Sequence, residues 1–420
     1  MNGDTPASFA DQPAWLENLK HDRKRTQKAI GWTGGVSDQV PWTLTSYIQA
    51  QAHPYDRYFY DPVTKAYTVD RFLEDLKIRY GGIDSVLMWS VYTQIGVDDR
   101  NQFDMWRSMP GGLEGVANLT AQLHSHGVKM LWPNKPWDLG TRYEPAGRPG
   151  LSDTDAKVYA TLLKQTDGDG LNRDTMDSFS KEFYAESARL GHSIALEPEN
   201  GVEDEALDWS TINWGYWSYP KAPVVDRFKF VTEGRFLTNV YNRWAKDKTN
   251  DLQSAWFNGD GYESWENVWG VWNGITHYDG EAICRVGTML RYFGKEGFLA
   301  SPDWEPYARE VWQADVYSSK FPLKERGQSV WTIVNRKNSY SWFSCTQLRL
   351  VLGTQLRLVF VPTATAGFRH TATAASSSLA LPQTTSSRPS LPPCASSPPG
   401  TWPVTTTPGS TCPRRWWRSL

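Results

Sequence analysis

Carboxylic acids recur near the ends of short apolar runs in the body of the chain. Asp169 lies in DGDGLN, Glu197 lies in HSIALEPE, and Asp260 directly follows LQSAWFNG. Cleavage of a glycosidic bond takes two carboxyl groups, one as acid and one as nucleophile or base. Carboxyl groups crowded in a partly dry pocket acquire different pKa values, so that one of them stays protonated. We therefore predict Asp169 as nucleophile or electrostatic partner, with Asp260 or Glu197 as the acid/base.

Tryptophan and amide side chains stand beside these acids. The chain contains 22 Trp, and an indole offers a large apolar face that suits the C–H face of a sugar ring. Trp89, Trp137 and Trp214 are predicted to form a sugar platform, with Asn134 and Lys135 holding hydroxyl groups. Further substrate-binding candidates are Asp138, Asn172, Glu199, Asn258 and Asp303. We expect an oligo- or polysaccharide as the substrate.

Structural explanations compete with chemical ones at several positions. The three tryptophans of WENVWGVW are spaced i, i+4, i+7, which predicts a packed helical face. Asp260 and Glu263 fit a capping box at the start of that helix. Asp174 fits the N-cap of a helix predicted directly after it. Glu263 and Asp174 therefore have a structural role available as well as a chemical one.

The apolar runs alternate with helical patterns, which predicts βα units and a parallel sheet. Strands are predicted over 45–51, 83–90, 128–133, 167–172, 192–199, 211–217, 252–259 and 297–304. Helices are predicted over 68–80, 113–127, 152–165, 175–191 and 233–247. Eight such units predict a (β/α)8 TIM barrel, in which chemistry gathers where the strands end. A doubly wound open sheet is the alternative, although no GxGxxG or P-loop motif follows any predicted strand.

Four segments are predicted along the chain. They are an N-terminal helical extension (1–44), the barrel (45–305), the start of a small β-domain (306–345) and a low-complexity, disordered tail (346–420). No Asp or Glu follows Glu325, and Ser, Thr, Pro and Ala then dominate. Such a composition buries too little apolar surface to offset its ordering entropy. The tail is either a natural Pro/Ser/Thr segment or the product of a frame error or an unspliced gene model.

Charge and hydropathy exclude several classes of partner. The formal net charge of −2 gives no reason to expect nucleic acid, and no apolar run is long enough to cross a bilayer. The N-terminus lacks the apolar core of a signal peptide, so the protein is either cytoplasmic or has its true start upstream. Neither HExxH nor GxSxG occurs. We predict no metal and no cofactor, and the sequence leaves the oligomeric state open.

Five longer stretches carry a family resemblance. They are DRYFYDPVTKAYTVDRFLEDLKIRYGGIDSVLMW, GVDDRNQFDMWRSMPGG, WPNKPWD, NGDGYESWENVWGVWNGIT and FLASPDWEPY. They resemble a family of glycoside-hydrolase-like (β/α)8 barrels that is distantly similar to α-galactosidases and is sometimes fused to a formylglycine-generating, sulfatase-modifying domain. The chain departs from α-galactosidases at the fourth strand, where Asp169-Gly170-Leu171-Asn172 replaces Lys-x-Asp, and after the sixth strand, where no carboxylate follows directly.

The resemblance implies a carbohydrate-active barrel that hydrolyses a glycosidic bond with a carboxylate pair. Two alternatives remain open. The chain could be a glycan-binding barrel without catalysis, or the accessory N-terminal region of a sulfatase-modifying protein. The first alternative predicts sugar binding without hydrolysis, and the second predicts a further domain in the complete gene product.

Overall fold

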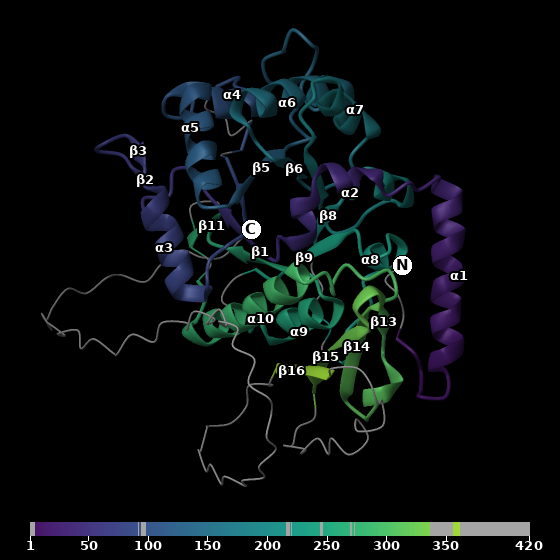
Figure 1. The fold of residues 1–420 in the computed structure, drawn as a ribbon. Coiled ribbons are helices and arrows are strands. Elements are labelled where there is room, and N and C mark those ends of the chain that lie inside the picture. The colour runs from purple at the N-terminus through teal and green to yellow at the C-terminus, as the bar shows by residue number, and fades with distance from the viewer. Residues whose placement is uncertain are drawn as a thin grey trace, which may run out of the picture. The chain divides into compact units, whose positions relative to one another are not determined.

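The computed structural model describes residues 5–90, 92–93, 98–215, 219, 221–243, 247–268, 271–272, 274–336 and 356–361 (Figure 1). Of the segment expected to form a tail, only residues 356–361 belong to this described part. Residues 356–361 form a strand, in contrast to the expected disorder, and the expectation for residues 346–355 and 362–420 lies outside the described residues.

Eight parallel strands form a nearly closed barrel. They are β1 (Ile48–Ala52), β4 (Ser85–Met88), β5 (Lys129–Asn134), β6 (Gly170–Arg173), β7 (Ala195–Pro198), β8 (Ile212–Gly215), β9 (Leu237–Tyr241) and β10 (Gly261–Trp265). Their order in the sheet is β7-β6-β5-β4-β1-β10-β9-β8. The two ends of this order meet through a parallel bridge between Glu199 and Trp214. The (β/α)8 prediction is therefore confirmed over the open doubly wound sheet.

Helices connect the strands and cover the barrel. They are α3 (Val69–Tyr80), α4 (Gln102–Arg107), α5 (Gly112–Ser125), α6 (Ser152–Thr166), α7 (Lys181–Arg189), α8 (Arg227–Val231), α9 (Thr249–Asn258) and α10 (His277–Lys295). Two more, α1 (Gln12–Ile30) and α2 (Gly35–Gln39), precede the first strand. Short 3-10 turns lie at Pro41–Thr45, Asp204–Asp208, Arg309–Val311 and Lys324–Arg326. Figure 1 shows α9 and α10 side by side.

Strand side chains alternate between the helices and the barrel interior. In β1, Ile48 and Ala50 join the apolar cluster that contains Leu76 of α3. Between them, the side chain of Gln49 contacts Glu197 of β7. Because β1 and β7 are not neighbours in the sheet, this contact crosses the interior of the barrel. Every residue of β1 is buried, as expected for a parallel strand covered on both faces.

The last two strands of the barrel differ from the prediction. Residues 252–259, expected as a strand, lie in α9 and its C-cap, and no strand forms over residues 297–304. Residues 237–241 instead form β9 inside an expected helix, and residues 261–265 form β10. The expected capping box and helical tryptophan face are therefore wrong. Alternation explains β10, because Tyr262 belongs to the apolar cluster that contains Leu76 of α3, whereas Trp265 stacks with Trp214 of β8 and Tyr241 of β9.

Smaller sheets complete the described structure. The strands β13 (Glu305–Pro306), β14 (Val316–Leu323) and β15 (Gln328–Asn335) are antiparallel, and β16 (Leu356–Val361) pairs with β15 in parallel. Two hairpins pair β2 (Tyr60–Asp61) with β3 (Ala66–Tyr67), and β11 (Asn267–Val268) with β12 (Val271–Trp272). The predicted small β-region after the barrel is confirmed. In the described part of the chain, no helix has the length and apolar character to span a membrane.

Candidate active site

Two glutamates and three amides meet inside the barrel. The amide of Gln49 on β1 donates to both oxygens of Glu197 on β7, at 3.0 and 3.1 Å, and to Oε2 of Glu263 on β10, at 2.7 Å. Glu197 also accepts from Asn172 of β6 at 3.2 Å and from Asn239 of β9 at 2.9 Å. We call these five side chains the interior layer. It brings together residues from five different strands.

Burial and mutual charge perturb both acids of the interior layer. Burial raises the pKa of Glu197 to about 7, against hydrogen bonds from Asn239, Gln49 and Asn172 that lower it. The pKa of Glu263 is raised well above its usual value, first by burial and then by the charge of Glu197. Two nearby carboxyl groups without an adjacent cation resist double ionisation. The interior layer is therefore able to hold a proton.

A second pair of acids stands where β6 and β7 end. Asp174 directly follows β6, and Glu199 directly follows β7. The indole N–H of Trp137 donates to Asp174 at 3.1 Å, and the backbone N–H of Thr175 donates to Glu199 at 2.5 Å. Arg243 approaches Glu199 at 4.0 Å. These residues lie at the carboxyl ends of the strands, where barrel enzymes carry their chemistry, and we call this region the mouth.

The two acids of the mouth lie within electrostatic reach of each other. Burial raises the pKa of Glu199, and the negative charge of Asp174 raises it further, whereas the backbone N–H of Thr175 and the charge of Arg243 oppose that rise. Burial also raises the pKa of Asp174, but the neighbouring Trp137, Lys135 and Arg243 oppose that rise. Asp174 therefore has two cations that favour its ionised form, whereas Glu199 has one cation and one anion, which act in opposite directions. This asymmetry suits one carboxylate and one carboxylic acid.

Aromatic rings form two groups around the mouth. In the first, Tyr92 stacks on Trp137 with ring centroids 5.5 Å apart and meets Trp89 edge-on at 6.0 Å. In the second, Trp214, Tyr241 and Trp265 stack on one another, the closest two rings being 4.0 Å apart. The guanidinium of Arg243 lies 4.3 Å from the centroid of Trp265.

Lys135 is buried against the first of these groups. Its ammonium donates to the hydroxyl oxygen of Ser90 at 3.1 Å and lies 4.9 Å from the ring centroid of Tyr92. Burial lowers the pKa of Lys135 to about 7, although the charges of Asp174 and Asp138 act in the opposite direction. The amine therefore changes charge near neutral pH, beside an acid of the mouth.

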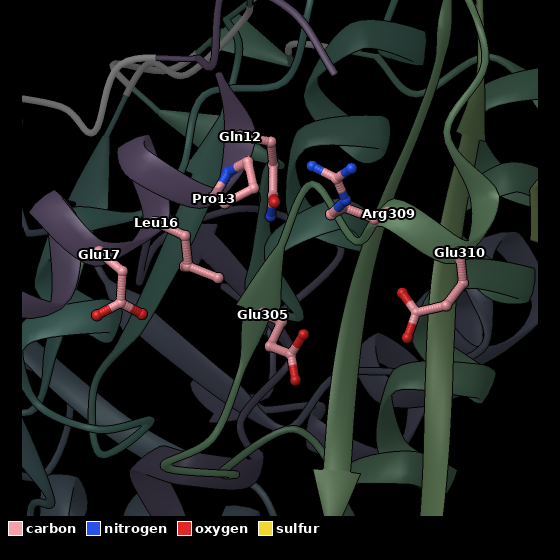
Figure 2. Close-up of a pocket in the computed structure, with 7 residues that line it drawn as sticks. All are labelled: Gln12, Pro13, Leu16, Glu17, Glu305, Arg309 and Glu310. Atoms are coloured by element: carbon pink, nitrogen blue, oxygen red, sulfur yellow. The ribbon is translucent and has the colours of Figure 1, made fainter. Parts of the chain in front are cut away.

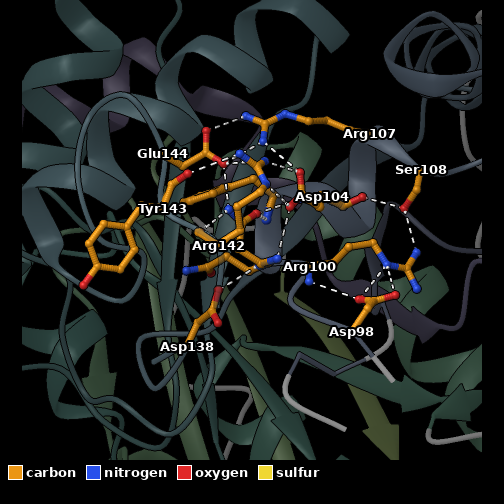
Figure 3. Close-up of polar contacts among 12 residues, drawn as sticks. Asp98, Arg100, Asp104, Arg107, Ser108, Asp138, Arg142, Tyr143 and Glu144 are labelled. Carbon is orange, nitrogen blue, oxygen red and sulfur yellow. Dashed lines mark hydrogen bonds and ion pairs between the residues drawn. The ribbon is translucent and has the colours of Figure 1, made fainter. Parts of the chain in front are cut away.

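An ion-pair network fastens the segment after β5 to α4 (Figure 3). Glu144 binds Arg107 through two hydrogen bonds, at 2.7 and 3.0 Å, and accepts from Asn101 at 2.7 Å. Arg142 pairs with Asp104 at 2.5 Å, and Asp104 also pairs with Arg107 at 3.2 Å. Bidentate pairs between an arginine and a carboxylate hold both side chains in a defined geometry. Since Lys135 and Trp137 begin the same segment, the network holds their backbone in place.

Asp169 is not at the mouth. It immediately precedes β6, and its carboxylate pairs with Nε2 of His124 and Nζ of Lys129, each at 2.7 Å. It also accepts from the backbone N–H of Met130. Burial alone would raise its pKa, but the contacts with His124, Lys129 and Met130 lower it overall. The expected position of Asp169 at a strand end is wrong, because the strand begins after this residue.

The predicted position of Asp260 at a strand end is also wrong. It immediately precedes β10 and is fully buried, with the ammonium of Lys229 at 3.5 Å. Asp226 lies beside it and accepts from the hydroxyl of Thr238 at 2.7 Å. Burial and the charge of Asp226 raise the pKa of Asp260 well above its usual value. The three charged groups form a packed cluster at the amino ends of the strands, away from the mouth.

Four predicted sugar-binding residues have structural partners instead. Asn134 donates to Gln102 at 3.2 Å and to Asp155 at 2.9 Å. Asp138 accepts from the backbone N–H of Gln102 at 2.8 Å. Two others lie elsewhere: Asn258 is inside α9 and caps the N–H of Asp226, and Asp303 pairs with Lys324 at 2.7 Å. The structure brings Glu197, Asn172, Glu199, Lys135, Trp89, Trp137 and Trp214 to the interior layer and the mouth.

Several residues of these two regions were not among the predicted site residues, including Glu263, Asp174, Gln49 and Asn239. The sequence around Glu263 and Asp174 also fitted helix caps, but β10 is a strand and α7 begins only at Lys181. Gln49 and Asn239 occupy interior positions of strands. The available signal was a buried polar residue flanked by apolar residues at alternate positions, as in IQAQA and LTNVY. Such residues point away from the helices.

A separate surface cavity of about 290 Å³ lies against α1 (Figure 2). Its lining includes Gln12, Leu16, Glu17, Glu305, Arg309 and Glu310. None of its lining residues belongs to the interior layer or the mouth. Within the described residues, no three His, Cys, Asp or Glu side chains are grouped in a way that could hold a metal ion.

Comparisons with known proteins identify similar solved structures. No protein-family model and no curated protein matches the chain. The chain is similar to the α-N-acetylgalactosaminidase NagBb from Bifidobacterium bifidum in its Gal-NHAc-DNJ complex, with a TM-score of 0.50, 14% identity, and coverage of 75% of this chain and 61% of NagBb. It is also similar to an α-amylase from Geobacillus thermoleovorans complexed with acarbose, with a TM-score of 0.43, 12% identity, and coverage of 67% and 84%.

A third similar structure is a GH31 family sulfoquinovosidase from E. rectale, with a TM-score of 0.44, 11% identity, and coverage of 69% of this chain and 57% of that one. The chain thus spans less than two thirds of the length of NagBb. At such identities the likeness to NagBb shows the fold alone. The comparisons give no support for the expected link to sulfatase-modifying proteins.

Proposed function

We propose that this chain is a glycoside hydrolase that binds a saccharide at the mouth. Asp174 acts as the nucleophile or base, and Glu199 acts as the general acid. The observation that carries the proposal is the convergence of these two acids with two groups of aromatic rings at the carboxyl ends of the strands. Hydrolysis of a glycosidic bond needs such a pair in two protonation states.

The roles follow from the charges around each acid. Lys135 and Arg243 both favour the ionised form of Asp174, which suits a group that attacks or activates water. Asp174 in turn favours the protonated form of Glu199, which suits a group that protonates the leaving oxygen. Asp169 and Asp260 take no part in this proposal, because both precede their strands.

The sugar would lie between the aromatic groups. Trp137 donates its indole N–H to Asp174, so its ring is fixed beside the reacting groups and can support one sugar face. The buried stack of Trp214, Tyr241 and Trp265 would supply a second apolar contact at the ends of β8, β9 and β10. The buried amine of Lys135 is placed to bind a hydroxyl group or an acidic substituent.

The test uses Asp174→Asn and Glu199→Gln in the full chain, with Asp169→Asn as a matched buried control. A panel of aryl glycosides with good and poor leaving groups, and natural oligosaccharides, is screened for turnover. We expect Asp174→Asn to lower kcat by about 10²-fold or more, as removal of a positioned acid–base group typically does. Glu199→Gln should lower kcat mainly on poor leaving groups, and Asp169→Asn should retain turnover once its folded fraction is counted.

Three results would contradict the proposal. Full turnover by both mouth variants on a cleaved glycoside would exclude their roles. Sugar binding by the wild-type chain without any turnover would favour the glycan-binding alternative. Absence of both binding and turnover across the panel would remove the carbohydrate proposal altogether.

A further inference from the structure

The two acids of the interior layer differ in their hydrogen bonds. Glu197 accepts from the side-chain amides of Gln49, Asn172 and Asn239, which come from three strands. Amide N–H groups can only donate, and an ionised carboxylate can only accept. Three donors therefore match the ionised form of Glu197 and stabilise its charge.

Glu263 has a much poorer set of partners. Its Oε2 accepts from Gln49 at 2.7 Å, whereas Oε1 has no hydrogen-bond partner among the described residues. The indole of Trp214 lies near enough to favour the ionised form weakly. Among the ion pairs of the described residues, none includes Glu197 or Glu263. A buried charge with so few partners is costly, and protonation removes that cost.

Charges on neighbouring strands act in the same direction. Glu197 on β7 and Glu199 beyond it both disfavour ionisation of Glu263. On the adjacent strand β9, the residue paired with Glu263 is Tyr241, and on β1 it is the neutral Gln49. Glu263 thus faces two acids, and the amide and indole groups that oppose them carry no full charge.

We propose that Glu263 is the second of the two interior-layer acids to lose its proton, so that in mildly alkaline solution a carboxylic acid stands beside the Glu197 carboxylate beneath the mouth. A neutral Glu263 adds no negative charge beneath Glu199. An ionised Glu263 would instead repel both Glu197 and Glu199 inside a dry barrel. The part that concerns Glu199 rests on the proposed function, whereas the location of the proton does not.

Difference infrared spectroscopy of the full chain in mildly alkaline solution, where Glu197 is ionised, tests the location of the proton. The carbonyl stretch of a protonated carboxyl group is compared between wild type and the variants Glu263→Gln, Glu197→Gln and Asp169→Asn. We expect Glu263→Gln to lose the signal of one carboxylic acid. Asp169→Asn, a buried carboxylate held by Lys129 and His124, should leave that signal unchanged, and Glu197→Gln should retain it.

Loss of the signal in Glu197→Gln but not in Glu263→Gln would overturn the proposal, as would its absence from wild type. If Glu263→Gln does not fold, Glu263→Asp replaces it, and the signal should move in frequency while Glu197→Asp leaves it in place. A signal that stays at the same frequency in Glu263→Asp would also contradict the proposal.

The pH profile of kcat/KM tests the effect on Glu199. Because Glu263 is neutral where Glu199 titrates, Glu263→Gln should leave the alkaline limb at the same pH. A limb that moves to lower pH would show that Glu263 carried a negative charge, and it would refute the proposal. If the mouth variants kept full turnover while Glu263→Gln lost the infrared signal, the proposed function would fail and the proton assignment would stand.

Discussion

Replacement of Gly261 by alanine should disrupt the interior layer without touching a charged group directly. A Cβ atom at this position would lie 2.5 Å from Oδ1 of Asn239, 2.9 Å from a methyl carbon of Leu237 and 3.1 Å from the backbone oxygen of Tyr47. The first distance is far below van der Waals contact, so Asn239 must move. Its hydrogen bond to Glu197, 2.9 Å in the native structure, would be lost.

The expected cost follows from three contributions. Overpacking a buried site costs about 1–3 kcal/mol. Loss of a hydrogen bond to a charged group costs about 1.5–3 kcal/mol. Alanine has less conformational freedom than glycine in the unfolded chain, which stabilises the folded state by about 0.4–1 kcal/mol. The net decrease in the free energy of unfolding is therefore about 2–5 kcal/mol.

Urea denaturation followed by tryptophan fluorescence measures this change. Gly201→Ala is the matched control, since a Cβ at Gly201 would meet only Asp177, at an ordinary 3.7 Å. The control should raise the free energy of unfolding by about 0.4–1 kcal/mol, because only the unfolded-chain contribution applies to it. If Gly261→Ala and Gly201→Ala proved equally stable, the close packing of Asn239 over β10 would be refuted.

Three further predictions concern charged groups. Burial raises the pKa of Glu197 from 4.5 to about 7, so the native state binds more protons in that interval. Its contribution makes stability fall by about 3 kcal/mol as pH rises through that interval. Glu197→Gln should remove this slope in urea titrations at several pH values, and an unchanged slope would contradict the assignment. The pKa of Asp169 is lowered, so its stabilising effect is present above the unfolded pKa and is lost as pH falls through the folded pKa. Asp169→Asn should therefore cost about 1–3 kcal/mol at pH 7 and little in strong acid, measured by thermal unfolding; an equal cost at both pH values would be the contrary result. Loss of the fork between Glu144 and Arg107 in Glu144→Gln should increase proteolytic cleavage after β5, and unchanged cleavage would show that the network does not hold the segment.

The sequence predicted six of the eight barrel strands because their apolar runs are short and bounded by glycine or polar residues. The other two, β9 and β10, place Asn239 and Glu263 inside the barrel. Polar interior residues remove the continuous apolar run typical of a buried parallel strand. The indole spacing in WENVWGVW then favoured a helix instead.

The candidate site was predicted in part. Glu197, Glu199 and Asn172 lie in or directly after strands whose ends were predicted closely, so they were placed correctly. Asp169 and Asp260 each lie one residue before a strand. For Asp169, a small shift in the strand boundary moves the side chain from one end of the barrel to the other, whereas for Asp260 the run predicted as the preceding strand is the helix α9. Sequence patterns do not resolve such a shift, whereas the ion partners of Asp169 do.

The network of Arg107, Arg142, Asp104 and Glu144 has a consequence for ligand binding. Because these salt links tether the segment that follows Lys135 and Trp137, the proposed function predicts that this wall of the mouth needs little ordering when a sugar binds. Binding of a sugar would then cost little conformational entropy of this segment. The chain should then distinguish saccharides by their shape and hydroxyl pattern. Binding kinetics should show no slow phase in which a loop becomes ordered.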